Sequence, residues 1–166
     1  MHGGILIIDY GSQYTQLIAR RVRELNVYCE IHPYNKVNRK LLKLLKPNGV
    51  ILSGGPNSIL DKGAPNLPRC IQDASKPILG ICYGLQLLVN NNGGKIKKSL
   101  SREYGYAKLK ILRSSEILPN EWINKSPNVW MSHGDSVSYV PKNFQIIAKS
   151  NNNIISIIES KKEKIF

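Results

Sequence analysis

The sequence lacks the features of several protein classes. Its 166 residues contain only three cysteines, and none of them belongs to a Cys-x-x-Cys pair. An odd number without that spacing argues against a disulfide framework and against a zinc site, and it favours a reducing, cytoplasmic setting. No apolar run approaches the ~20 residues of a membrane-spanning helix, and the first residues lack a signal-peptide pattern. We therefore expect a cytoplasmic protein with no metal site and no membrane partner.

Acidic residues are scarce as well. The chain has 11 Asp and Glu against 24 Lys and Arg, so its formal net charge is +13. Such a charge can indicate a nucleic-acid partner, but here the cations are scattered, and aromatic residues, only 7% of the chain, do not interleave with them to stack bases. Lys, Asn and Ile have AT-rich codons and account for 54 of the 166 residues. Codon bias explains the charge, and we expect no nucleic-acid partner.

Hydrophobic residues, in contrast, make up 42% of the chain, which is enough for one domain with a buried core. In the first 92 residues, short β-branched runs alternate with segments of helical spacing. The runs that predict buried strands are 5–8, 27–31, 50–52 and 77–81. The segments that predict helices are 12–25, 39–46 and 83–89. This alternation predicts a parallel sheet with helices on its faces.

The second half of the chain has a different pattern. Short strand-like segments are joined by turns, at 95–100, 105–113, 128–132, 144–149 and 154–158. The run Asn151-Asn152-Asn153 predicts a hairpin turn between the last two of them. The expected fold class is α/β: an open, mostly parallel sheet flanked by helices, with antiparallel strand additions in the second half.

The strongest chemical signal is Gly-Ile-Cys-Tyr-Gly at 80–84, between a predicted buried strand and a predicted helix. It has the G-x-C-x-G form of a nucleophile elbow, in which the glycines around Cys82 let the strand and helix backbones approach. The thiol would lie at the start of the helix, where peptide dipoles favour a thiolate, and the Tyr83 N–H would point toward a substrate oxyanion. The alternative is a core cysteine between two chance glycines. Cys29 and Cys70 lack this setting and are expected to be ordinary buried or half-buried thiols.

A glycine pair, Gly54-Gly55, ends another predicted central strand. Ligand sites in open parallel sheets gather at the carboxyl ends of the strands, so this loop and Cys82 can face each other. Its backbone N–H groups would supply a second oxyanion donor; the alternative is a tight turn with no ligand. The loop also resembles the SGGxDS pyrophosphate loop of ATP pyrophosphatases, but Asn57 replaces the Asp and no clear helix follows to hold phosphate.

Histidine is rare in the chain. His133, followed by Gly134 and Asp135 at the expected end of a strand, is a candidate base by residue type. A histidine in such a place is as often structural as catalytic. His32 precedes a proline at the end of a predicted strand, and we interpret it as incidental.

Taken in order, these motifs resemble the class I (triad-type) glutamine amidotransferase family, and more narrowly its GMP synthase branch. The resemblance covers nearly all 166 residues. The segments that carry it are Ile8–Glu24, Ser53–Pro56 with Ser58, Gly80–Gln86, Arg102–Gly105 and Ser132–Asp135. It implies the family's flavodoxin-like fold and hydrolysis of glutamine to glutamate and ammonia by a Cys-His-Glu triad. The ammonia would pass to an ATP-dependent synthetase domain that converts XMP to GMP in purine nucleotide biosynthesis.

The resemblance also implies a role for each site residue. Cys82 would be the nucleophile, and Tyr83 and Gly55, with Gly54, would supply the oxyanion N–H groups. The implied glutamine-binding residues are Gln86, His133, Gly134 and Asp135. The family assigns the catalytic base to a later histidine, so His133 becomes a pocket residue rather than the base.

At its end the sequence departs from the family pattern. The family's triad His and Glu lie in an H-P-E motif on a strand near the end of the domain, but no histidine follows His133 and no His-x-Glu occurs. We expect residues 1–166 to form an amidotransferase domain that is incomplete at its C-terminus, with the synthetase (ATP pyrophosphatase) domain absent from the chain. A fragment is favoured over a degenerate protein because every other motif is intact. Such a fragment would have little or no glutaminase activity.

The same resemblance sets the expected partners. These are glutamine as substrate, the synthetase domain in cis or as a subunit, and a second copy in a homodimer of the full-length enzyme. No cofactor is expected in this domain, since ATP and Mg²⁺ would bind only in the synthetase domain. Two other function classes stay open: another cysteine-elbow hydrolase such as a γ-glutamyl peptidase, and a non-catalytic basic binding module. The first has no reason to carry the Ile8–Glu24 segment, and the second needs a clustered cationic face.

Overall fold

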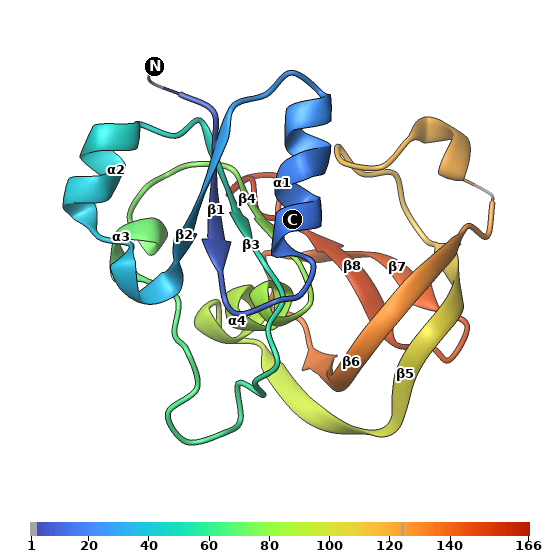
Figure 1. Ribbon diagram of the computed structural model, residues 1–166. Helices are drawn as coiled ribbons and strands as arrows, with labels where there is room; N and C mark the ends of the chain where they lie inside the picture. The colour runs from blue at the N-terminus through green and yellow to red at the C-terminus, as the bar shows by residue number, and fades with distance from the viewer. Residues whose placement is uncertain (1–2, 124) are drawn as a thin grey trace. The chain divides into compact units, whose positions relative to one another are not determined.

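The computed structural model describes residues 3–123 and 125–166, apart from the side chains of 99–104 and 133 (Figure 1). The chain divides into two compact units. The first comprises the chain up to Leu88 together with Glu163–Ile165, and the second comprises Val89–Lys162 with Phe166. No helix in the described part of the chain is long and apolar enough to span a bilayer.

The first unit is built on a four-stranded parallel sheet. Its strands are β1 (Ile5–Asp9), β2 (Cys29–Pro33), β3 (Gly49–Leu52) and β4 (Ile78–Gly80). They lie in the order β2-β1-β3-β4, and each neighbouring pair is parallel. β3 is buried along its whole length, as a strand covered by helices on both faces should be. The predicted parallel sheet is confirmed.

Helices cover both faces of this sheet (Figure 1). They are α1 (Thr15–Glu24), α2 (Arg39–Leu45), α3 (Arg69–Gln72) and α4 (Tyr83–Asn91), with a 3-10 turn at Tyr34–Lys36. Side chains of α1 pack against one face, around Ile7 and Ile51. Side chains of α2, α3 and α4 pack against the other face, around Leu6, Ile8 and Leu52. Neighbouring strand residues enter different clusters because side chains alternate between the faces of a sheet.

Local chemistry explains the boundaries of α2. Asn38 caps its start, since the side-chain oxygen accepts a hydrogen bond from the Leu41 N–H at 3.0 Å. The helix ends at Lys46, which has a left-handed φ of +46° and is followed by Pro47. α3 was not predictable in the same way, because four residues are too few to show a helical period.

The second unit is an antiparallel sheet. Its strands are β5 (Lys95–Ile111), β6 (Asn128–Tyr139), β7 (Gln145–Ser150) and β8 (Ile155–Glu159), in the order β6-β5-β7-β8, with a 3-10 turn at Asn120–Trp122. The antiparallel additions are confirmed, and so is the turn at 151–153, where Asn153 has a φ of +63°. The two strands predicted at 95–100 and 105–113 are a single strand, β5, whose pairing with β6 shifts register between Lys98 and Glu103.

After β8 the chain returns to the sheet of the first unit. Ile165 forms a parallel bridge with Ile78, and the Ile78 N–H donates to the Lys164 carbonyl at 2.9 Å. β4 is an edge strand of that sheet. The last residues of the chain therefore lie beside the strand that leads to Cys82.

Candidate active site

The turn between β4 and α4 holds Cys82 in a strained backbone conformation. Its φ is +51°, in the left-handed region that residues other than glycine rarely occupy. Hydrogen bonds fix the turn: the Ile81 N–H donates to the Leu52 carbonyl and the Gly84 N–H donates to the Ile81 carbonyl, both at 2.9 Å. Strain of about 1–3 kcal/mol persists only where the surroundings impose it, and such positions cluster at functional sites. The geometry of a nucleophile elbow is present at Cys82.

The two glycines of the elbow are required by close backbone approach. A Cβ at Gly80 would lie 2.6 Å from Leu88 Cδ1 and 2.7 Å from the Leu85 amide nitrogen. A Cβ at Gly84 would lie 2.5 Å from the Leu52 carbonyl oxygen. Because no side chain tolerates such contacts, any residue other than glycine would displace α4 from the strands it follows.

The loop after β3 brings backbone N–H groups to Cys82. A Cβ added at Gly54 would be 3.4 Å from Cys82 Cβ, so the loop lies close beside Cys82. The Ser53 hydroxyl orients the loop by donating to the Gly54 carbonyl at 2.8 Å. Among the described residues, the N–H groups of Gly54, Gly55 and Tyr83 donate to no protein acceptor. Unpaired N–H groups of this kind are the donors that an oxyanion site needs.

The Cys82 thiol is exposed, yet the protein atoms around it raise its pKa above the ordinary value by desolvation. The sequence predicts the opposite direction, since the start of a helix favours a thiolate. Burial of the sulfur acts in the other direction, and desolvation is the cause of the raised pKa. The thiol is protonated at neutral pH, so nucleophilic attack needs a base.

Two tyrosines hold the elbow and the neighbouring loop together. Tyr83 is buried, and its hydroxyl donates to the Pro65 carbonyl at 2.6 Å. Its ring lies 5.3 Å from that of Tyr10, which stacks on Tyr34 at 5.5 Å. Burial raises the pKa of Tyr83 to about 12 and also raises the pKa of Tyr10. Both phenols are therefore donors and packing groups at neutral pH rather than bases.

Gln86 lies one turn after Cys82 on α4. Its N–H donates to the Cys82 carbonyl at 3.1 Å, and the residue is only 8% exposed. Five of the residues singled out by the sequence thus share one region of the first unit: Gly54, Gly55, Cys82, Tyr83 and Gln86.

Ser12 belongs to the same region, although the sequence pattern gives it no role. Its Oγ lies 3.5 Å from the position that a Cβ of Gly54 would occupy. The Oγ accepts a hydrogen bond from the Tyr14 N–H at 3.1 Å, which leaves the hydroxyl proton for another acceptor. The strand order could have pointed to Ser12. It directly follows β1, which lies next to β3, and the carboxyl ends of adjacent parallel strands lie at the same edge of the sheet.

The remaining predicted residues lie in the second unit. His133, Gly134 and Asp135 are inside β6, which continues to Tyr139, so the expectation that the strand ends at His133 is wrong. Pairing with β5, where Asp135 lies opposite Lys98, overrides the turn propensity of Gly-Asp. Gly134 and Asp135 are half-buried, and the side chain of His133 lies outside the described residues.

The other cysteines and the acidic residues form no second centre of this kind. Cys29 is buried and Cys70 is half-buried, as the sequence predicts. Among the described side chains, no group of three or more His, Cys, Asp or Glu residues is arranged to hold a metal ion.

Known proteins share both the sequence and the fold. The family model for class I glutamine amidotransferases matches residues 6–166. The glutamine-hydrolyzing GMP synthase of Brachyspira hyodysenteriae is 46% identical over 162 residues, which are 98% of this chain and 31% of that protein. The corresponding enzyme of Elusimicrobium minutum is 49% identical over 160 residues, 96% of this chain and 31% of that protein. The chain thus spans about a third of the length of these curated relatives.

Solved structures give the same result. One from Thermoplasma acidophilum, provisionally described as one subunit of a GMP synthase, is 29% identical and has a TM-score of 0.81 over 99% of this chain and 81% of its own. A glutamine amidotransferase from Thermotoga maritima, 18% identical, has a TM-score of 0.76 over 99% of this chain and 74% of its own, which shows a shared fold. With the family model matched from residue 6 to residue 166, the chain belongs to the class I glutamine amidotransferase family.

Proposed function

We propose that this chain is the glutaminase part of a GMP synthase, which releases ammonia from glutamine for the ATP-dependent conversion of XMP to GMP in purine biosynthesis. Family membership supports a glutamine substrate, and identities of 46% and 49% to GMP synthases support this branch of the family. The observation that carries the proposal is the Cys82 elbow, with its φ of +51° and with Gly54 against its Cβ. The relatives favour this function over a γ-glutamyl peptidase or a non-catalytic basic module.

In the proposed reaction the Cys82 sulfur attacks the carbon of the glutamine side-chain amide. The carbonyl oxygen becomes an oxyanion, which accepts hydrogen bonds from the N–H groups of Tyr83 and Gly55, with Gly54. Collapse of this intermediate breaks the C–N bond, and the nitrogen leaves as ammonia with the proton that the thiol gave up. Water then hydrolyses the thioester to glutamate and restores the thiol. The residues that we assign to glutamine binding are Gln86, His133, Gly134 and Asp135.

The thiol proton needs an acceptor, because desolvation raises the pKa of Cys82. Ile165 pairs in parallel with Ile78, four residues before Cys82. Residues that continued this pairing beyond Phe166 would run beside the elbow, and we assign the triad His and Glu to such a segment. Without them, general acid–base help worth roughly 10²–10⁴-fold is missing, so we expect residues 1–166 alone to have little or no glutaminase activity.

The proposal assigns the remaining steps to other parts of the enzyme. ATP and Mg²⁺ would bind in the synthetase part, whether this follows in cis or is a separate subunit, so the amidotransferase domain needs no cofactor of its own. We further propose that the enzyme is cytoplasmic and that its full-length form is a homodimer.

Reaction with a glutamine-like affinity label tests the proposal. The chain is incubated with the chloromethyl ketone analogue of glutamine, and modified residues are located by peptide mass spectrometry. We expect modification at Cys82, protection by glutamine, and loss of labelling in Cys82→Ser. Cys70→Ser is the matched control and should be labelled as the unaltered chain is. Modification mainly at Cys29 or Cys70, or labelling that glutamine does not slow, would contradict the proposal.

A further inference from the structure

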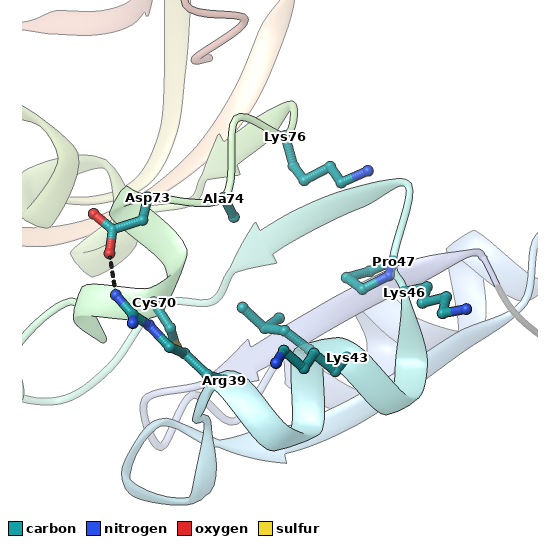
Figure 2. A pocket seen from close by; sticks show the side chains of 9 residues that line it. Arg39, Lys43, Lys46, Pro47, Cys70, Asp73, Ala74 and Lys76 are labelled. Atoms are coloured by element: carbon teal, nitrogen blue, oxygen red, sulfur yellow. Dashed lines mark hydrogen bonds and ion pairs between the residues drawn. The ribbon is translucent and has the colours of Figure 1, made fainter.

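A groove of about 510 Å³ lies between α2 and α3 of the first unit (Figure 2). Its floor is apolar and consists of buried and half-buried residues: Leu42, Pro47, Cys70 and Ala74. Neither Cys82 nor the glycine pair of the elbow site lines it. The groove is therefore separate from the proposed glutamine site.

Basic side chains surround this floor. Arg39, Lys43 and Lys46 come from α2 and its C-terminal end, and Lys76 lies across the groove (Figure 2). Arg39 Nη2 forms an ion pair with Asp73 Oδ2 at 3.1 Å, which joins α2 to the residue after α3. Within the described part of the chain, the three lysines form no ion pair. The lysines therefore give the rim an uncompensated positive charge.

The construction of the groove favours a protein segment over a small molecule. Small-molecule sites are enclosed and fix their ligand with a few well-placed polar groups. Here the cations are exposed on long side chains, and even in the Arg39–Asp73 pair the side chains are 80% and 62% exposed. An apolar floor inside a polar, solvent-accessible rim is the anatomy of a protein–protein interface.

Charge decides which kind of segment fits. The rim lysines attract Asp and Glu, and the apolar floor accepts the apolar stripe of an amphipathic helix. A second copy of this chain fits poorly, because a net charge of +13 repels like charge. We infer that the groove docks an acidic amphipathic helix of a partner protein, with its carboxylates beside Lys43, Lys46 and Lys76. This inference is independent of the chemistry at Cys82.

Binding of a model peptide tests the inference. The probe is a fluorescein-labelled peptide of about 14 residues, roughly four helical turns, with leucines along one face and glutamates on either side of them. Its fluorescence anisotropy is measured against the intact chain at low and at physiological salt. We expect binding that weakens as salt rises, because the Debye length shrinks to about 8 Å at physiological ionic strength.

Charge reversals on α2 distinguish binding in the groove from nonspecific attraction of an acidic peptide to a basic protein. We expect Lys43→Glu to weaken binding about tenfold, because it places a like charge beside the peptide. Lys40→Glu makes the same change at an exposed position of the same helix outside the groove, and it should leave the affinity within about twofold. Lys43→Gln removes the charge without reversing it and should have an intermediate effect. Circular dichroism checks that all three variants are folded.

Cys70, on the floor of the groove, gives an independent readout. Bound peptide should slow the alkylation of Cys70 and leave that of Cys82 unchanged. No binding at low salt, equal weakening by Lys43→Glu and Lys40→Glu, or an unprotected Cys70 would overturn the inference. Binding of ADP without binding of the peptide would also overturn it, and would indicate a small-anion site. Because glutamine-protected labelling tests the Cys82 site and peptide binding tests the groove, failure here and failure of the proposed function are distinguishable.

Discussion

The backbone of Gly84 packs directly on Leu52: a Cβ at Gly84 would lie 2.5 Å from the Leu52 carbonyl oxygen. This contact joins the start of α4 to the end of β3 and sets the position of Cys82. We predict that Gly84→Ala lowers the free energy of unfolding by about 3 kcal/mol, because α4 must shift to make room. Urea unfolding followed by circular dichroism measures the loss.

Gly63→Ala is the matched control for this substitution. Gly63 has a φ of +81°, but nothing lies within 4 Å of an added Cβ, so its cost is backbone strain of about 1 kcal/mol. Equal losses of stability in the two variants would contradict the close contact at Gly84.

The same contact explains why the elbow is predictable from sequence. Cys82 directly follows the predicted strand 77–81, and the glycines two residues before and after it encode a backbone approach that only a strand–turn–helix requires. The pKa of the thiol is not predictable in this way. It depends on atoms that neighbouring segments bring around the sulfur, and a local pattern shows only the helix that follows it.

Part of the second unit could not be predicted from the sequence, because it depends on pairing between distant segments. The polar stretch 101–104 and the Gly134-Asp135 pair both have the composition of turns, so each predicts the end of a strand. Both lie inside long strands, because β5 and β6 pair on either side of them: 95–98 with 135–139, and 103–108 with 128–133. Strand propensity is context-dependent, and a partner that lies 20 to 44 residues away supplies the context.

The raised pKa of Cys82 predicts how its reactivity depends on pH. Desolvation disfavours the thiolate, so the rate of alkylation by iodoacetamide should rise around a midpoint above that of an unstructured cysteine. The fold favours the neutral thiol. Its contribution to stability is therefore complete below the unfolded-state pKa and is lost as pH rises through the folded-state pKa. Timed alkylation with peptide mass spectrometry gives the profile, and a Cys82 that reacts faster than a model peptide at neutral pH would refute it.

Tyr83 provides a test of how the loop beside the elbow is anchored. Tyr83→Phe removes the hydroxyl that donates to the Pro65 carbonyl at 2.6 Å. We expect a loss of about 1 kcal/mol in unfolding free energy and faster proteolysis in the loop 56–68, because a hydrogen bond is lost without replacement. Tyr106→Phe is the control, since Tyr106 is 85% exposed and its change should cost almost nothing. A Tyr83→Phe variant as stable as this control would show that the hydrogen bond does not hold the loop.

Ser12 is predicted to contact glutamine if the proposed function is correct. Its Oγ and Cys82 Cβ lie 3.5 and 3.4 Å from the same point beside Gly54. We expect Ser12→Ala to raise the concentration of affinity label needed for the half-maximal rate about three- to tenfold, with the maximal rate nearly unchanged. Ser58→Ala is a close control, because the Ser58 Oγ also accepts an N–H two residues on, at 3.1 Å. The same effect from both substitutions would show that Ser12 does not contact the bound label.

The parallel bridge between Ile165 and Ile78 predicts where the catalytic base enters. A segment that continued this pairing would reach the level of Cys82 within a few residues, because parallel strands advance together. We therefore expect that the chain, extended past Phe166 with the residues that follow the matched region in the Brachyspira hyodysenteriae GMP synthase, gains glutaminase activity by roughly 10²–10⁴-fold. Ammonia release measures the gain, and Cys82→Ser in the extended chain should abolish it. Equal activity with and without the extension would mean that the base lies within residues 1–166, and His133 would then be the candidate.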